Sequence, residues 1–94
     1  MTRYRAAQGY VLREWDGEYL LIPVKLSGGK KPQMAILNPC GGFLWEALQE
    51  DRSFDELLRL LTDEYEVSTD QAERDIREFL DILDGFELLL RSEA

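Results

Sequence analysis

Few side chains in this 94-residue sequence could form or break covalent bonds. The single cysteine, Cys40, lies at a predicted helix start, where the helix dipole can lower the pKa of a thiol. The chain contains no histidine, so the commonest general base that would activate such a thiol is missing. Free cysteines also serve as small buried apolar groups. The pattern therefore favours a packing role for Cys40 over the role of a nucleophile.

The acidic residues do not form a recognisable metal or catalytic motif. Neighbouring carboxylates such as Asp63 and Glu64 belong to a helical pattern, and no Asp-x-Asp-x-Asp-Gly loop is present. The Gly28-Gly29 pair lacks the spacing and the Gly-Lys-Ser/Thr ending of a phosphate-binding loop. We therefore predict a protein that binds no metal and no organic cofactor and is not itself an enzyme.

The segment that would position Cys40 is MAILNPCGGFLWEAL, residues 34–48. Its first four residues, Met34–Leu37, predict a short strand, and short strands often lie at a sheet edge. Asn38 is a favourable N-cap, and Pro39 suits the first position of a helix. The apolar residues that follow have helical spacing. This segment therefore predicts an edge strand that leads directly into a buried helix.

Two runs of β-forming residues, 10–15 and 18–24, precede this segment and flank Asp16-Gly17. Such a two-residue loop is a strong hairpin signal because both positions tolerate positive φ. Residues 1–9 show no periodicity and are expected to form a loose N-terminal segment. The lysine- and glycine-rich residues 25–33 are expected to form a solvated loop or a basic rim beside a groove. The Asp16-Gly17 turn between the two runs predicts three cross-strand pairs: Trp15 with Glu18, Arg13 with Leu20, and Val11 with Ile22.

Two further helices are predicted after the central segment. Ser53 with Glu56 forms a capping-box pattern, and Ser68 with Gln71 repeats this start signal. Apolar residues follow both starts at helical spacing, and Gly85 supplies a stop. We therefore predict an α+β fold, in which a small antiparallel three-stranded sheet is followed by three helices in a winged helix-turn-helix-like arrangement.

Composition limits the domain count, the partners and the compartment. We expect residues 1–94 to form one domain, with its core within residues 10–90. Residues 1–45 carry six basic and three acidic side chains, whereas residues 46–94 carry five basic and sixteen acidic ones. An acidic helical half repels phosphate backbones, which argues against nucleic acid as a partner. No apolar run could span a membrane and no secretory signal is visible, so we expect a cytoplasmic protein.

Three motifs follow one another in this chain: VLREWDGEYLLIPV, a Leu-Asn-x-x-x-x-x-Leu-Trp pattern at residues 37–45, and an Asp-x-x-x-Phe-Leu-x-x-Leu pattern at residues 75–83. Over about residues 10–90 the sequence thereby resembles the PqqD-like proteins, named after protein D of pyrroloquinoline quinone biosynthesis. The resemblance implies a peptide chaperone, or RiPP recognition element. Such a domain binds the leader segment of a ribosomally made precursor peptide and presents it to a modifying enzyme, often a radical SAM enzyme.

The resemblance also implies where a leader would bind. In this family the leader adds as an extra strand beside the third strand, in a groove against the third helix. Main-chain hydrogen bonds then supply affinity, and pockets for alternate side chains supply selectivity. The apolar stripe of the third helix is wider than one core face needs, and Ile82 is a better candidate than Phe79 for the groove wall. The matching positions are Met34, Ala35, Ile36 and Leu37 on the strand, and Arg74, Asp75, Glu78, Phe79 and Ile82 on the helix.

Other functions fit the same order of elements. The outer sheet face could dock an enzyme, which would make the chain an adaptor or structural subunit without a leader peptide. A winged helix could bind DNA, but residues 70–84 carry six acidic side chains against Arg74 and Arg77, which does not suit a major groove. An unpaired strand edge could also pair with a second copy of the chain to give a homodimer.

Overall fold

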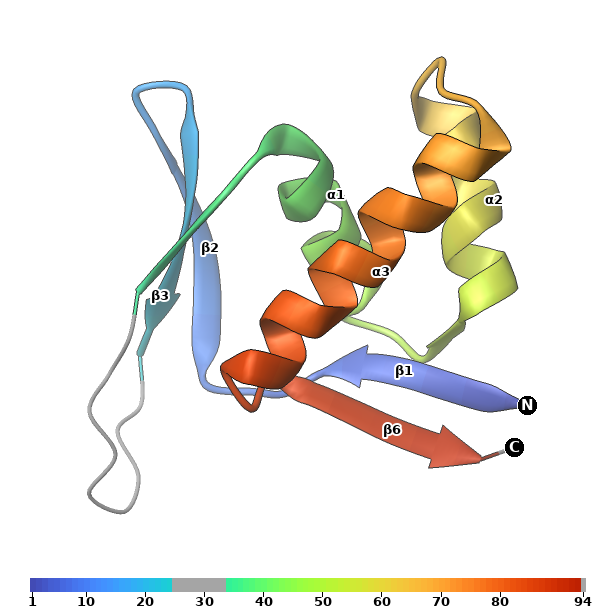
Figure 1. Cartoon of the computed structure of the whole chain (residues 1–94). Coiled ribbons are helices and arrows are strands. Elements are labelled where there is room, and N and C mark those ends of the chain that lie inside the picture. The colour runs from blue at the N-terminus through green and yellow to red at the C-terminus, as the bar shows by residue number, and fades with distance from the viewer. Residues whose placement is uncertain (25–33, 94) are drawn as a thin grey trace.

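The computed structural model describes residues 1–24 and 34–93, in which three helices pack against two small antiparallel sheets (Figure 1). The predicted α+β fold is confirmed, and the predicted loop at residues 25–33 lies outside the described residues. In chain order the elements are β1 (Thr2–Ala6), β2 (Tyr10–Trp15), β3 (Glu18–Pro23), β4 (Ala35–Leu37), α1 (Pro39–Ala47), β5 (Arg52–Ser53), α2 (Phe54–Glu64), α3 (Thr69–Gly85) and β6 (Leu89–Glu93).

The first sheet has the strand order β2-β3-β4, with β2 and β3 joined by the predicted tight turn. Asp16 and Gly17 both adopt positive φ, at 52° and 81°, as a type I′ hairpin turn requires. The three predicted cross-strand pairs are all present, so the predicted register of the hairpin is confirmed. Strand β4 continues the sheet beyond β3, where Ile36 pairs with Leu20.

The second sheet, with strand order β5-β1-β6, was not predicted. The expectation that residues 1–9 form a loose segment is wrong, because Thr2–Ala6 pairs along its whole length with the C-terminal strand β6. The two chain ends therefore lie side by side (Figure 1). The partner of β1 is about 85 residues away in sequence, so no local pattern could reveal this pairing. Further main-chain hydrogen bonds attach this segment to the core, from Ala6 N to Leu48 O and from Ala7 N to Leu88 O, both at 2.8 Å.

All three helix starts lie where the sequence placed them. Asn38 Oδ1 accepts a hydrogen bond from Gly41 N at 2.7 Å, and Pro39 occupies the first helical position. Ser53 forms a complete capping box with α2, and Ser68 caps α3 through its side-chain oxygen. Each cap satisfies main-chain N–H groups that the first turn leaves without a helical partner.

The three helices share one apolar core with the inner face of the β2-β3-β4 sheet. Each helix turns one stripe of its surface inward, and β3 adds a side chain from the sheet. Helix α3 passes between the β2-β3-β4 sheet and α2 in the view of Figure 1, and its residues form one wall of a groove beside β4. The largest fully buried side chains are Leu21, Leu44, Leu48, Leu57, Leu61, Ile76 and Leu83.

Two carboxylates connect β1 to its neighbours and make the stability of the fold depend on pH. A hydrogen bond from the main-chain N–H of Ser53 lowers the pKa of Glu56, and the guanidinium of Arg3 at 2.9 Å lowers it further. A hydrogen bond of 2.6 Å from the Thr2 hydroxyl lowers the pKa of Glu93 in the same way. Folding therefore favours the ionised form of both side chains.

We expect the free energy of unfolding to fall in acid because of these two groups. Their stabilising contribution is complete above the ordinary pKa of a glutamate and is lost as the pH falls through the lowered pKa values of the folded state. Urea unfolding between about pH 6 and pH 3 measures the effect. A Glu56→Gln/Glu93→Gln variant should show a weaker dependence on pH, and an unchanged dependence would contradict this assignment.

Candidate functional site

A groove of about 290 Å³ lies between β4 and α3. Within the described residues, β4 pairs with β3 on one side only and leaves its other edge open to this groove. In an antiparallel strand every second residue turns its N–H and C=O away from the paired neighbour, so β4 offers main-chain groups to another strand. The groove is lined by Ile36, Leu37, Asn38, Cys40, Gly41, Asp75, Glu78, Phe79 and Ile82.

The strand wall follows from the alternation of side chains along β4. Ala35 and Leu37 face the core and are buried, whereas Ile36 points away from it and is 68% exposed. The side chain of Met34, which precedes the strand, is also exposed. A long apolar side chain at the open edge is unusual for a strand that remains in water, because such edges attract other strands.

The helix wall follows from the 3.6-residue period of α3. Asp75, Glu78, Phe79 and Ile82 have the i, i+3, i+4, i+7 spacing that places them on one helical face. Phe79 is almost completely buried and forms the floor, whereas Ile82 is 44% exposed and stands at the side. The structure thus places Ile82 on the helix side of the groove, and its role in peptide binding stays a prediction.

Three of the predicted residues do not line the groove. Met34 precedes β4, Ala35 turns inward, and Arg74 is exposed and donates a hydrogen bond to Gln71 Oε1 at 3.2 Å. Arg74 is adjacent to Asp75 in sequence, but one residue of helix rotates the side chain by about 100°. The structure brings together the remaining predicted residues: Ile36, Leu37, Asp75, Glu78, Phe79 and Ile82.

Sequence reasoning missed three residues that line the groove: Asn38, Cys40 and Gly41. A Cβ atom on Gly41 would lie 3.3 Å from the Cβ of Leu37 and 3.4 Å from Cδ1 of Phe79, so glycine allows β4, α1 and α3 to approach closely here. A Cβ on Gly42 would lie 2.9 Å from the Tyr19 ring. The sequence did contain a signal of this close packing. Two glycines stand in the first turn of a helix, where the chain does not reverse and glycine is not needed for a turn.

The environment of Cys40 disfavours a reactive thiolate. Burial raises the pKa of the Cys40 thiol, and the negative charge of Asp75 across the groove raises it further. Both effects favour the protonated thiol over the thiolate. The structure thus agrees with a packing role for Cys40 at the edge of the groove.

Metal binding and membrane crossing have no counterpart in the described residues, 1–24 and 34–93. No group of three or more histidine, cysteine, aspartate and glutamate side chains in these ranges could hold a metal ion. In the same ranges no helix has the length and apolar character needed to cross a membrane.

The structure is similar to two solved structures of peptide-bound proteins. One is described as TbiB1 in complex with the TbiA(beta) leader peptide, with 27% sequence identity and a TM-score of 0.70, and the similarity covers 90% of this chain and 93% of that chain. The other is described as lasso peptide synthetase B1 complexed with the leader peptide, with 24% identity, a TM-score of 0.69 and coverage of 93% and 96%. At 24% identity, the similarity to the second structure shows only that the two chains share a fold.

The sequence itself is similar to a described family over most of its length. Residues 24–89 match the family model of coenzyme PQQ synthesis protein D (PqqD). The chain therefore belongs to the PqqD family, as the sequence motifs predicted. No curated protein sequence matches the chain.

Proposed function

We propose that this chain is a non-catalytic peptide-binding chaperone. It binds the leader segment of a ribosomally made precursor peptide as an added strand at β4 and presents that peptide to a modifying enzyme, such as a radical SAM enzyme. The observation that carries the proposal is the open edge of β4 beside the groove against α3. The similarity to TbiB1, which is described in complex with a leader peptide, supports the same role here.

The groove has the two components that strand addition requires. The free edge of β4 supplies main-chain hydrogen bonds, which are independent of the leader's sequence. Phe79 and Ile82 supply apolar contacts for those leader side chains that face the groove. An unstructured leader loses conformational entropy when it becomes a strand, so we expect an affinity on the order of micromolar.

Leader binding would also deliver the precursor to its modifying enzyme, because the leader and the modifiable segment belong to one peptide. A bound leader keeps the modifiable segment of the same precursor close to the enzyme, which raises its effective concentration without any new contact to that segment. A chain of this kind needs neither cofactor nor catalytic base, and it would work in the cytoplasm, where precursor peptides are made.

One observation favours an adaptor function as a second candidate. On the outer face of the β2-β3-β4 sheet, Trp15 is 74% exposed and Ile36 is 68% exposed. Leu20, which pairs with Ile36, is half-buried on the same face. Such a surface could contact an enzyme directly, with or without a leader.

A titration of the isotope-labelled chain with synthetic leaders of the precursors encoded beside its gene distinguishes these functions. Saturable amide shifts at Ile36, Leu37 and Ile82 in the micromolar range would support leader binding in the groove. Shifts confined to Trp15 and Leu20 would favour the adaptor function. The absence of shifts with every leader would refute the chaperone proposal.

Cys40 offers a second test because it is the only cysteine and lines the groove. We expect a saturating leader to slow the alkylation of Cys40 by iodoacetamide several-fold, since an added strand would cover the thiol. A matched control carries Trp15→Cys in a Cys40→Ser background, which places the thiol on the outer face. Its alkylation rate should not change, and equal rates for Cys40 with and without leader would contradict strand addition beside this residue.

A further inference from the structure

The groove between β4 and α3 is acidic at one end and apolar at the other. Asp75 and Glu78 lie nearer the N-terminus of α3, and Phe79 and Ile82 lie nearer its C-terminus. On the other wall, Ile36 precedes Asn38 and Cys40 along the chain. The charge of Asp75 acts on the Cys40 thiol, which places Cys40 at the acidic end.

The distance along α3 between the acidic and the apolar end of the groove matches the distance between alternate side chains of an added strand. The midpoint of Asp75 and Glu78 is four residues from the midpoint of Phe79 and Ile82, and four residues of helix rise by about 6 Å. Leader side chains on one face of a strand recur every second residue, at about 6.6 Å. One groove-facing side chain can therefore meet the acidic end while the next, two residues away, meets the apolar end.

The carboxylates at the acidic end lack a positive partner within the described residues. Asp75 Oδ1 accepts a hydrogen bond from the neutral amide of Gln71 at 2.8 Å, and the carboxylate of Glu78 makes no hydrogen bond or ion pair in these ranges. The neighbouring cations are engaged elsewhere: Arg74 donates to Gln71, and Arg77 lies over the Phe54 ring at 5.6 Å. A peptide covering the groove would remove water from these carboxylates, which is unfavourable unless it brings a cation.

We propose that this groove selects leader segments in which a lysine or arginine and a large apolar side chain are separated by one residue. The basic side chain would bind Asp75 and Glu78, and the apolar one would pack on Phe79 and Ile82. This inference rests on the proposed function and adds the sequence class of the leader. The direction of the added strand decides which of the two residues comes first.

Selection from a display library of random 12-residue peptides against the immobilised full chain tests the inference without knowledge of the natural precursor. We expect the enriched peptides to carry a basic and an apolar residue at positions i and i+2 in one predominant order. They should also shift the amides of Ile36 and Ile82 when titrated into the labelled chain. Their affinity should fall as salt increases, since part of it is electrostatic.

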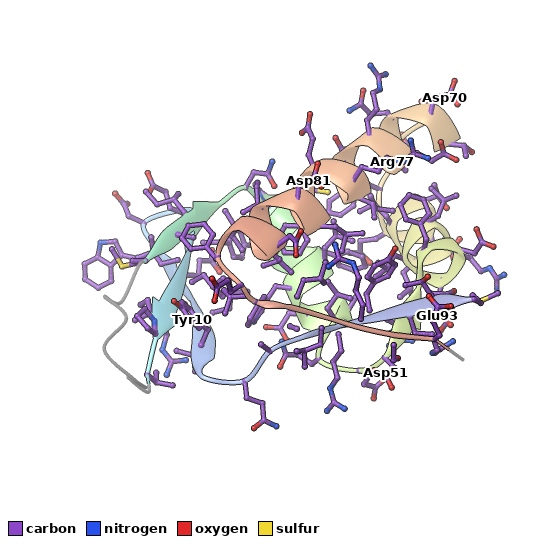
Figure 2. The ribbon with its side chains drawn as sticks, turned by 60° about the horizontal axis from the view of Figure 1, so that its bottom comes forward. Tyr10, Asp51, Asp70, Arg77, Asp81 and Glu93 are labelled. Carbon is purple, nitrogen blue, oxygen red and sulfur yellow. The ribbon has the colours of Figure 1, made fainter. Side chains whose placement is uncertain are left out.

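The enriched peptide with the highest affinity and its lysine-to-glutamine version then serve as matched probes. On the unaltered chain we expect the lysine version to bind about 3- to 20-fold more tightly. On an Asp75→Asn/Glu78→Gln variant the difference should fall below about twofold, because the ionic partners are gone. An Asp70→Asn/Asp81→Asn variant removes an equal number of negative charges from α3 (Figure 2), at two positions that do not line the groove, and should behave like the unaltered chain.

The outcomes separate the inference from the proposed function. Enriched peptides that bind in the groove without a basic residue, or a lysine preference that survives in the Asp75→Asn/Glu78→Gln variant, would overturn the inference and leave peptide binding intact. Enriched peptides that shift only amides outside the groove, or no enrichment at all, would refute both.

Discussion

Ile82→Glu is expected to weaken leader binding by about 10- to 100-fold. Ile82 is 44% exposed at the groove wall, so an added strand would bury the remaining part of a side chain whose complete burial contributes roughly 1.5–3 kcal/mol. The substitution also adds a carboxylate beside Asp75 and Glu78 that the leader would have to desolvate. Calorimetric titration with a binding leader measures the loss.

The control for this variant is Trp15→Glu, which places the same charge on the outer face of the sheet. Both side chains are exposed, so neither change should alter the free energy of unfolding by more than about 0.5 kcal/mol. If Trp15→Glu weakens leader binding and Ile82→Glu does not, the leader lies on the outer face and the groove assignment is wrong.

Leu21→Ala is expected to lower the free energy of unfolding by about 2–5 kcal/mol. Leu21 is completely buried on β3, where it joins the inner face of the sheet to the helices, and its truncation leaves a cavity in the shared core. For a chain of this size a loss of 1 kcal/mol lowers Tm by roughly 4–8 °C, so thermal unfolding detects the change easily.

Leu20→Ala is the matched control because Leu20 is the preceding residue and points to the outer face. Its truncation should lower stability by about 1 kcal/mol or less, since it removes fewer buried contacts. Similar losses for the two variants would mean that the two faces of the sheet are equally buried, for instance by a partner that covers the outer face.

The sequence by itself determined the local structure of this protein. The Asp16-Gly17 turn fixed the hairpin register because both residues accept positive φ, and once a tight turn is placed every cross-strand pair follows from it. Asn38, Ser53 and Ser68 fixed the helix starts, because capping depends on groups only three residues apart. The family was also visible in these local motifs, and the match over residues 24–89 agrees.

Only the tertiary structure decided which distant segments meet. The partner of β1 lies at the opposite end of the chain, and the polar sequence of Thr2–Ala6 carries no sign of it. The presence of Cys40 and Gly41 in the groove depends on how α1 and α3 pack. Asp75 raises the pKa of the Cys40 thiol across 35 positions of sequence. Burial and Coulomb interactions act through space, so these properties appear only when the chain has folded.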